Sequence, residues 1–181
     1  MKFNSTELLN DLAKRIENNI ARSTKLLEQS EDALNNKESS ESWSALECIE
    51  HLNLYDDFYI EEIKRRIEAN TSPSSTIFKS GLLGNYFALS MLPKKNGIQK
   101  MKTFKDKNPL HSKLNKSTIE KFIDHQHLML ELIKKAKSVN LQKVKTNISI
   151  SKVIKLRLGD TLRFVVYHYE RHLTQAERNI K

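Results

Sequence analysis

The stretch GLLGNYFALSMLPKKNG, residues 81–97, lies in the part of the chain that decides how its helices connect. The surrounding segment, residues 70–117, holds all three prolines and three of the four glycines, whereas the segments on either side have helical patterns. A connection of this length exceeds an ordinary loop between antiparallel helices. It therefore predicts a crossover between two helices that run the same way. GLLGNYFALSML, residues 81–92, is expected to form a small helix inside it.

Apolar residues recur every three or four positions in four segments outside this crossover, which predicts four amphipathic helices. The predicted helices cover residues 4–34, 43–69, 118–137 and a last segment from Gly159–Asp160 onwards. Ser44 and Glu47 have the spacing of a capping box at the start of the second helix, and Asp160 is the expected N-cap of the fourth. The sequence therefore predicts an all-α fold, a four-helix bundle with a long crossover between helices 2 and 3.

Length and composition indicate one domain over residues 1–181. No run of about eighteen apolar residues occurs, so no membrane-spanning helix is expected. The charged N-terminus lacks the apolar core of a signal peptide. The single cysteine, Cys48, excludes an internal disulfide and a zinc site built from several cysteines. These features favour a cytoplasmic protein.

The net charge of +9 is unevenly distributed along the chain. Residues 1–69 are acidic overall, whereas residues 70–117 carry nine lysines and one acid, and residues 134–157 carry eight basic residues and no acid. Two interpretations stay open for the basic segments 79–116 and 134–157: a solvated surface that favours solubility, or a patch for an anionic partner. No motif with interleaved aromatic residues organises them, so no specific nucleic-acid partner is expected.

The last predicted helix contains RFVVYHYERHLTQAERN, residues 163–179, in which His168 and His172 are four positions apart. Side chains at this spacing project from the same face of a helix, so the two imidazoles can reach one metal ion. They can equally be two ordinary helix histidines. The zinc-protease pattern is excluded, because Glu170 occupies the wrong place between them.

A third histidine, His51, occurs in ESWSALECIEHLNLYDDFY, residues 41–59, on the apolar stripe of the second helix with Cys48 and Tyr55. If the second and fourth helices are antiparallel, His51 and His172 lie at a similar depth in the bundle. His51 is then either a satisfied core residue or a third ligand. Three nitrogen ligands leave positions open for water or substrate, as in catalytic sites. The remaining histidines are interpreted as incidental: His111, His125 and His127.

Two motifs resemble a known family. SWSALECIEHL resembles the W-S-x-x-E-x-x-x-H-L segment of the DinB/YfiT-like superfamily, and LGDTLRFVVYHYERHLTQAERN resembles its last helix with the H-x-x-x-H-L-x-Q signature. The resemblance implies up-down-down-up connectivity and a divalent metal, nickel or zinc, bound by the positions corresponding to His51, His168 and His172. The chain departs from relatives that carry a His-Pro pair before the last helix, because it has KLRLGD there.

Characterised relatives include thiol-dependent S-transferases and isomerases and proteins described as metal-dependent hydrolases. The resemblance implies a metal-activated thiolate that attacks an electrophile, or a metal-activated water. Gln175 is expected to orient a ligand or water, and Glu47 to accept a hydrogen bond from a metal-binding histidine. The expected partners are a low-molecular-weight thiol and an electrophilic substrate, with no membrane and a possible homodimer. The alternative is a non-enzymatic basic module with a structural or vestigial metal.

Overall fold

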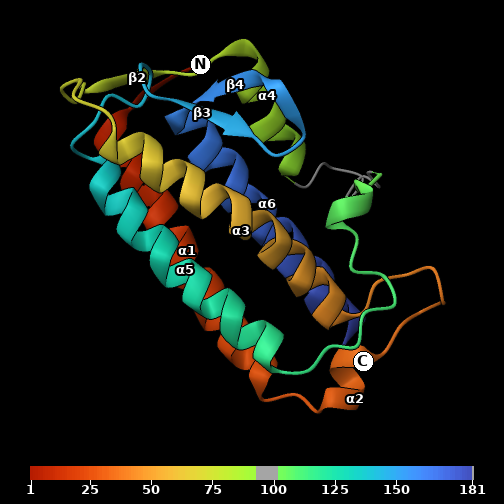
Figure 1. Cartoon of the computed structure of the whole chain (residues 1–181). Coiled ribbons are helices and arrows are strands. Elements are labelled where there is room, and N and C mark those ends of the chain that lie inside the picture. Colours follow the sequence, from red (N-terminus) through yellow and green to blue (C-terminus); the bar gives the residue numbers. More distant parts are fainter. Residues whose placement is uncertain (93–101, 181) are drawn as a thin grey trace.

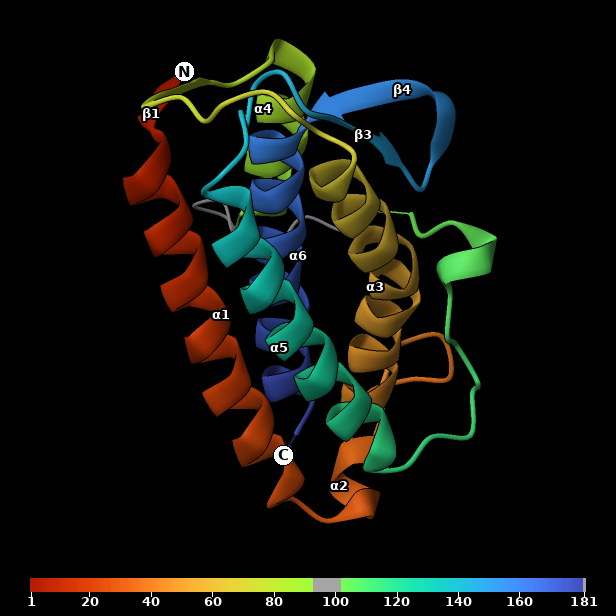
Figure 2. The same ribbon diagram turned by 60° about the vertical axis from the view of Figure 1, so that its left-hand side comes forward.

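The structure, a computed structural model, describes residues 1–92 and 102–180 (Figures 1 and 2). The part of the predicted crossover with Pro93 and Gly97 lies outside these residues. The four long helices are α1 (Ser5–Leu27), α3 (Ala45–Glu68), α5 (Ser117–Ala136) and α6 (Leu158–Asn179). Figure 2 shows α1 and α6 running in one direction and α3 and α5 in the other. Each of α1 and α3 packs against both α5 and α6, and their apolar faces enclose one hydrophobic core.

Shorter helices connect the long ones. They are α2 (Glu31–Asn35), α4 (Leu82–Met91) and the 3-10 helix η1 (Lys105–Lys107). The small helix predicted inside the crossover is α4, which packs against α6 through its buried side. Gly84 makes this approach possible, since a Cβ atom there would lie 2.6 Å from the Asp160 side chain. No helix among the described residues has the length and apolar character needed to cross a membrane.

The prediction of an all-α fold is incomplete, because the structure also contains two small antiparallel sheets. Strand β1 (Lys2–Asn4) pairs with β2 (Ile77–Lys79), and β3 (Lys145–Ile148) pairs with β4 (Ser151–Arg157). In β3 the side chains of Thr146 and Ile148 are buried while Lys145 is exposed. This alternation is typical of a half-buried strand. The basic segment 134–157, in which no strand was predicted, therefore contains a hairpin.

Local capping corrects the predicted start and end of two helices. The first helix ends at Leu27 rather than continuing to residue 34, because Ser30 caps the separate helix α2 by accepting a hydrogen bond from the Ala33 backbone N–H. The capping box at Ser44 is present as predicted, at the start of α3. Elsewhere the expected cap is wrong: Arg157, not Asp160, is the N-cap residue of α6.

Asp160 instead lies inside the first turn of α6, where its carboxylate is completely buried. It accepts a hydrogen bond from the Gly81 backbone N–H at 2.8 Å and another from the Ser80 hydroxyl. Gly81 is the N-cap residue of α4. Asp160, the residue expected to cap α6, therefore connects the start of α4 to α6.

Candidate metal centre

The structure brings together the three histidines singled out in the sequence. His51 lies in the second turn of α3, and His168 and His172 lie one turn apart on α6, which is antiparallel to α3. One ring nitrogen from each comes within 4.8 Å of the other two, and the Nε2 atoms of His51 and His168 are 3.2 Å apart. Their exposed fractions are 3%, 6% and 8%, so the cluster is buried in the bundle. No other cluster of His, Cys, Asp or Glu suited to a metal occurs in residues 1–92 and 102–180.

Hydrogen bonds fix the orientation of two of the rings. His51 Nδ1 lies 2.7 Å from the backbone carbonyl oxygen of Lys107. Because a carbonyl oxygen can only accept a hydrogen bond, Nδ1 carries the hydrogen and Nε2 keeps its lone pair. His172 Nδ1 lies 3.0 Å from Oε1 of Gln175 and donates to it. Metal-binding histidines commonly donate their second ring N–H to a carbonyl in this way. Both bonds leave Nε2 free to bind an ion.

Burial keeps the three imidazoles neutral. It lowers the pKa of His51 to about 4, with smaller contributions from the positive charges of Lys107 and Arg171. Burial also holds the pKa values of His168 and His172 well below their usual range, and the neighbouring histidines and Arg171 lower them further. Only the neutral imidazole binds a metal. At neutral pH the three side chains are therefore in the form that a cation requires.

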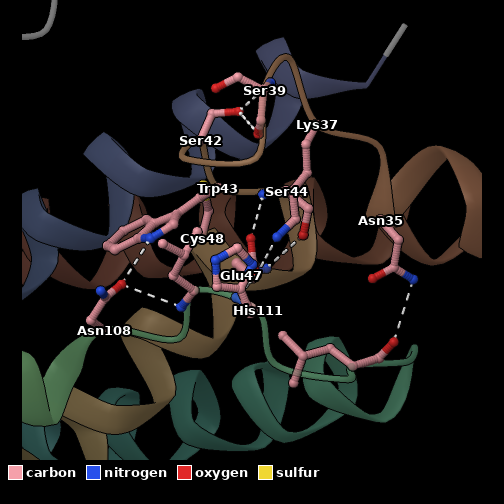
Figure 3. Close-up of polar contacts among 12 residues, drawn as sticks. Asn35, Lys37, Ser39, Ser42, Trp43, Ser44, Glu47, Cys48, Asn108 and His111 are labelled. Atoms are coloured by element: carbon pink, nitrogen blue, oxygen red, sulfur yellow. Dashed lines mark hydrogen bonds and ion pairs between the residues drawn. The ribbon is translucent and has the colours of Figure 1, made fainter.

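Trp43 closes one side of the cluster. Its ring centroid lies 4.7 Å from that of His51 and 5.8 Å from that of His172. The indole N–H donates to Oδ1 of Asn108 at 3.0 Å (Figure 3). This hydrogen bond joins the start of α3 to the end of the crossover. It holds an apolar ring beside the histidines.

Two aromatic rings cover another side. Tyr55 lies 4.9 Å from the ring centroids of both His51 and His168. Phe164, one turn before His168 on α6, stacks against its ring at 5.8 Å. Burial raises the pKa of Tyr55 to about 12, so its hydroxyl keeps its proton. Aromatic rings of Trp43, Tyr55 and Phe164 thus surround much of the histidine cluster.

Glu47 has a different role from the expected one. Its carboxylate accepts hydrogen bonds from the Ser44 backbone N–H at 2.9 Å, from Lys37 Nζ at 2.6 Å and from the His111 backbone N–H at 2.7 Å (Figure 3). Among the described contacts none joins Glu47 to His51. The Nδ1–H of His51 donates a hydrogen bond to the Lys107 carbonyl instead. Glu47 thus ties the crossover to the start of α3.

The remaining histidines and the cysteine lie outside the cluster. His125 on α5 lies 3.7 Å from carboxylate oxygens of Asp56 and Asp57, and His127 faces solvent. Cys48 is buried in the core, and burial raises the pKa of its thiol, so it stays protonated. These residues have surroundings that account for them without a metal.

Lys107 is the site residue that sequence reasoning missed. It contributes a backbone carbonyl, which any residue type supplies, and it belongs to a crossover without a regular pattern. No signal in the sequence could have identified it. Gln175 was expected to orient a ligand or water; in the structure its side-chain carbonyl accepts a hydrogen bond from the ring of His172.

Comparison with known proteins gives one match. The family model described as the DinB superfamily matches residues 15–176, which include most of α1, all of α3 and α5 and the three histidines. No curated protein and no solved structure matches the chain. Because the family model covers most of the chain, the protein belongs to the DinB superfamily.

Proposed function

We propose that His51, His168 and His172 bind one divalent cation, nickel or zinc, in an up-down-down-up four-helix bundle, and that the protein is a metal-dependent enzyme. The observation that carries this proposal is the convergence of three neutral imidazole nitrogens within 4.8 Å. The hydrogen bonds to Lys107 and Gln175 support it, since they direct two of the Nε2 lone pairs to the same place. Three protein ligands leave further coordination positions for a substrate.

The reaction that fits best is thiol-dependent S-transfer. A bound divalent ion would stabilise the thiolate of a low-molecular-weight thiol at neutral pH, and the thiolate is the nucleophilic form. Trp43, Tyr55 and Phe164 would exclude water from the reacting groups, and the uncharged Tyr55 hydroxyl adds no competing charge. The same arrangement suits a related hydrolysis in which water replaces the thiol. We infer a cytoplasmic location, where such thiols are kept reduced.

Metal content tests the site directly. The purified protein is loaded with nickel or zinc, dialysed and subjected to elemental analysis, together with His51→Ala, His168→Ala and His172→Ala. Each variant should lose most of the ion, because two imidazoles hold a metal far less well than three. His127→Ala is the matched control, since it removes an exposed histidine of α5. Thermal melting checks that each variant is folded. A folded His51→Ala variant with a full equivalent of metal would show that His51 is not a ligand.

A second assay addresses the reaction. Metal-loaded protein is incubated with a panel of low-molecular-weight thiols and electrophiles, and loss of free thiol is followed with time. Thiol consumption that requires the metal and disappears in His168→Ala supports S-transfer. The near-complete burial of the histidines favours the alternative, a basic binding module with a structural metal. In that case, the variants lose stability with their metal, and no thiol or electrophile in the panel is consumed.

A further inference from the structure

Exposed apolar side chains gather at the end of the bundle opposite the histidines. Ten large hydrophobic residues are exposed in the described part of the chain, and eight belong to β1–β2, α4 or the β3–β4 hairpin. These elements lie together at one end, whereas α2 and the C-terminus lie at the other (Figures 1 and 2). We call the eight residues the end patch: Met1, Ile77, Leu82, Leu83, Tyr86, Leu89, Ile150 and Val153.

The fold itself does not use the outer side of α4. Its buried side, with Gly84 and Ala88, packs against α6. Leu82, Tyr86 and Leu89 follow at helical spacing on the opposite side, and α4 contains no charged residue. Leu82 is 96% exposed and Tyr86 is 67% exposed. Side chains that stay in water contribute little to folding, and exposed apolar groups gathered in one region mark an interaction surface.

The hairpin adds to the same surface. Val153 in β4 is 88% exposed and Ile150 at its turn is 41% exposed. Both lie between lysines of a segment that has no acidic residue. The patch therefore extends over three separate elements at one end of the molecule.

Basic residues surround the end patch. Residues 70–92 and 134–157, which form most of this end, contain nine basic residues and no acid. Exposed lysines among them, and in β1, include Lys2, Lys79, Lys143, Lys145 and Lys155. Glu7 and Glu68 are exposed acids on the adjoining ends of α1 and α3. The surface thus combines projecting apolar side chains with a strong excess of positive charge.

We propose that this end of the protein docks on the surface of an anionic lipid bilayer. Leu82, Tyr86 and Val153 enter the interfacial region, and the lysines contact anionic headgroups. A second copy of the chain is a poorer occupant, because two such ends would bring like charges together. A nucleic acid would leave the apolar side chains without a partner. This proposal departs from the expectation that no membrane takes part, which rested on the absence of a spanning segment; docking on a bilayer surface needs no such segment.

The histidine cluster lies apart from this end, in the second turn of α3 and from the middle of α6 onwards. The docking surface and the metal centre share no residue. Lipid binding is therefore independent of the proposed function, and either can fail without the other. Lipid docking also gives the basic β3–β4 hairpin, which takes no part in the metal centre, a role in positioning the protein on the bilayer surface.

Vesicle sedimentation tests the proposal with the full chain. The protein is mixed with vesicles of phosphatidylcholine alone or with added phosphatidylglycerol. Wild-type protein should sediment only with the vesicles that contain phosphatidylglycerol, and less strongly at high salt. The double variant Leu82→Ser/Tyr86→Ser should bind at least about tenfold more weakly, since each buried Leu-sized side chain is worth roughly that factor.

Leu128→Ser provides the matched control. Leu128 is 45% exposed, but it lies in the middle of α5, away from the end patch. This variant should bind vesicles as the wild type does. All the variants should keep the wild-type melting temperature and metal content, because the substituted side chains are exposed and none of them belongs to the histidine cluster.

Four results would overturn the proposal. The first is absence of sedimentation with phosphatidylglycerol vesicles at low salt, and the second is equal binding by the wild type and the double variant. The third is a concentration-dependent dimer in analytical ultracentrifugation that the double variant abolishes, because the patch would then join two copies. Duplex DNA is a further probe. Binding to DNA that is tighter than binding to vesicles and unchanged in the double variant would also contradict lipid docking.

Discussion

The metal-free protein should be sensitive to mild acid because of His51. Its imidazole is buried beside Trp43 and Tyr55, and its pKa is about 4 in the folded protein against 6.5 for an exposed histidine. Below pH 6.5 the unfolded chain therefore binds a proton that the folded chain does not. The free energy of unfolding falls as the pH drops from about 6.5 to about 4, and this contribution levels off below that. Between pH 7 and pH 5, the loss from His51 alone is about 2 kcal/mol.

His168 and His172 act in the same direction, since burial also lowers their pKa values. Buried Asp56 acts in the opposite direction. Burial raises its pKa, so protonation of Asp56 stabilises the folded state relative to the unfolded chain as the pH falls. The total pH dependence therefore mixes several groups. A comparison of the wild type with His51→Gln isolates the His51 contribution, since glutamine does not titrate.

Urea denaturation with a metal chelator, at pH 7 and at pH 5, measures the effect. The wild type should lose about 2 kcal/mol more than His51→Gln between the two pH values. His127→Gln, which changes an exposed histidine, should behave as the wild type does. Equal pH dependence in wild type and His51→Gln would refute the description of His51 as a buried neutral imidazole.

Three other predictions follow from particular contacts. Gly84→Ala should lower stability by about 1 to 3 kcal/mol in thermal melts, because the new Cβ would lie 2.6 Å from the Asp160 side chain. Ser44→Ala should cost about 1 kcal/mol through loss of the capping box, and an unchanged melting temperature would contradict that role. Lys143→Gln/Lys145→Gln should leave metal content unchanged, because the hairpin lies at the far end of the bundle. The same double variant should reduce the weak binding of the protein to DNA in fluorescence titrations. Binding by the wild type should itself vanish near physiological salt.

The long helices could be predicted because local pattern and tertiary environment agree. Apolar residues at helical spacing, such as Leu12 and Ile16 in α1, are the ones that the core buries. The convergence of His51 with His168 and His172 was also predictable, since two antiparallel helices place residues at equal depth side by side. These inferences needed only the spacing within each helix and the relative direction of two helices.

The two sheets and the hydrogen bonds that orient the histidines were harder to predict from the sequence. The alternation in β3 and β4 is visible in the sequence, but it lies among several lysines, and no strand was predicted there. The bond from His51 to the Lys107 carbonyl depends on the path of the crossover in space. A backbone carbonyl has no side-chain signature. No reasoning from residue types could therefore assign it.

Asp160 shows why a correct local rule can lead to a wrong assignment. An acidic residue at the start of a helical pattern is a good N-cap, yet the Asp160 carboxylate reaches across to Ser80 and Gly81 at the start of α4. Arg163, one turn further along α6, donates to the Ser80 hydroxyl and to Asn85 Oδ1 at 3.1 Å each. The ion pair on α6 thus anchors the start of α4, whose N-cap residue Gly81 has no side chain to form a cap hydrogen bond.

The consequence concerns the outer face of α4. A short, uncharged helix without its own side-chain cap is unstable in isolation. Contacts with α6 therefore determine both its existence and its orientation. Asp160→Asn would keep the size of the side chain but remove its charge beside Arg163. It should weaken the attachment of α4, which amide hydrogen exchange in residues 82–91 would report. Metal content should stay unchanged, because Asp160 lies two turns before His168 on α6. If exchange in α4 stayed as slow as in the wild type, the charge of Asp160 would not be what holds this helix in place.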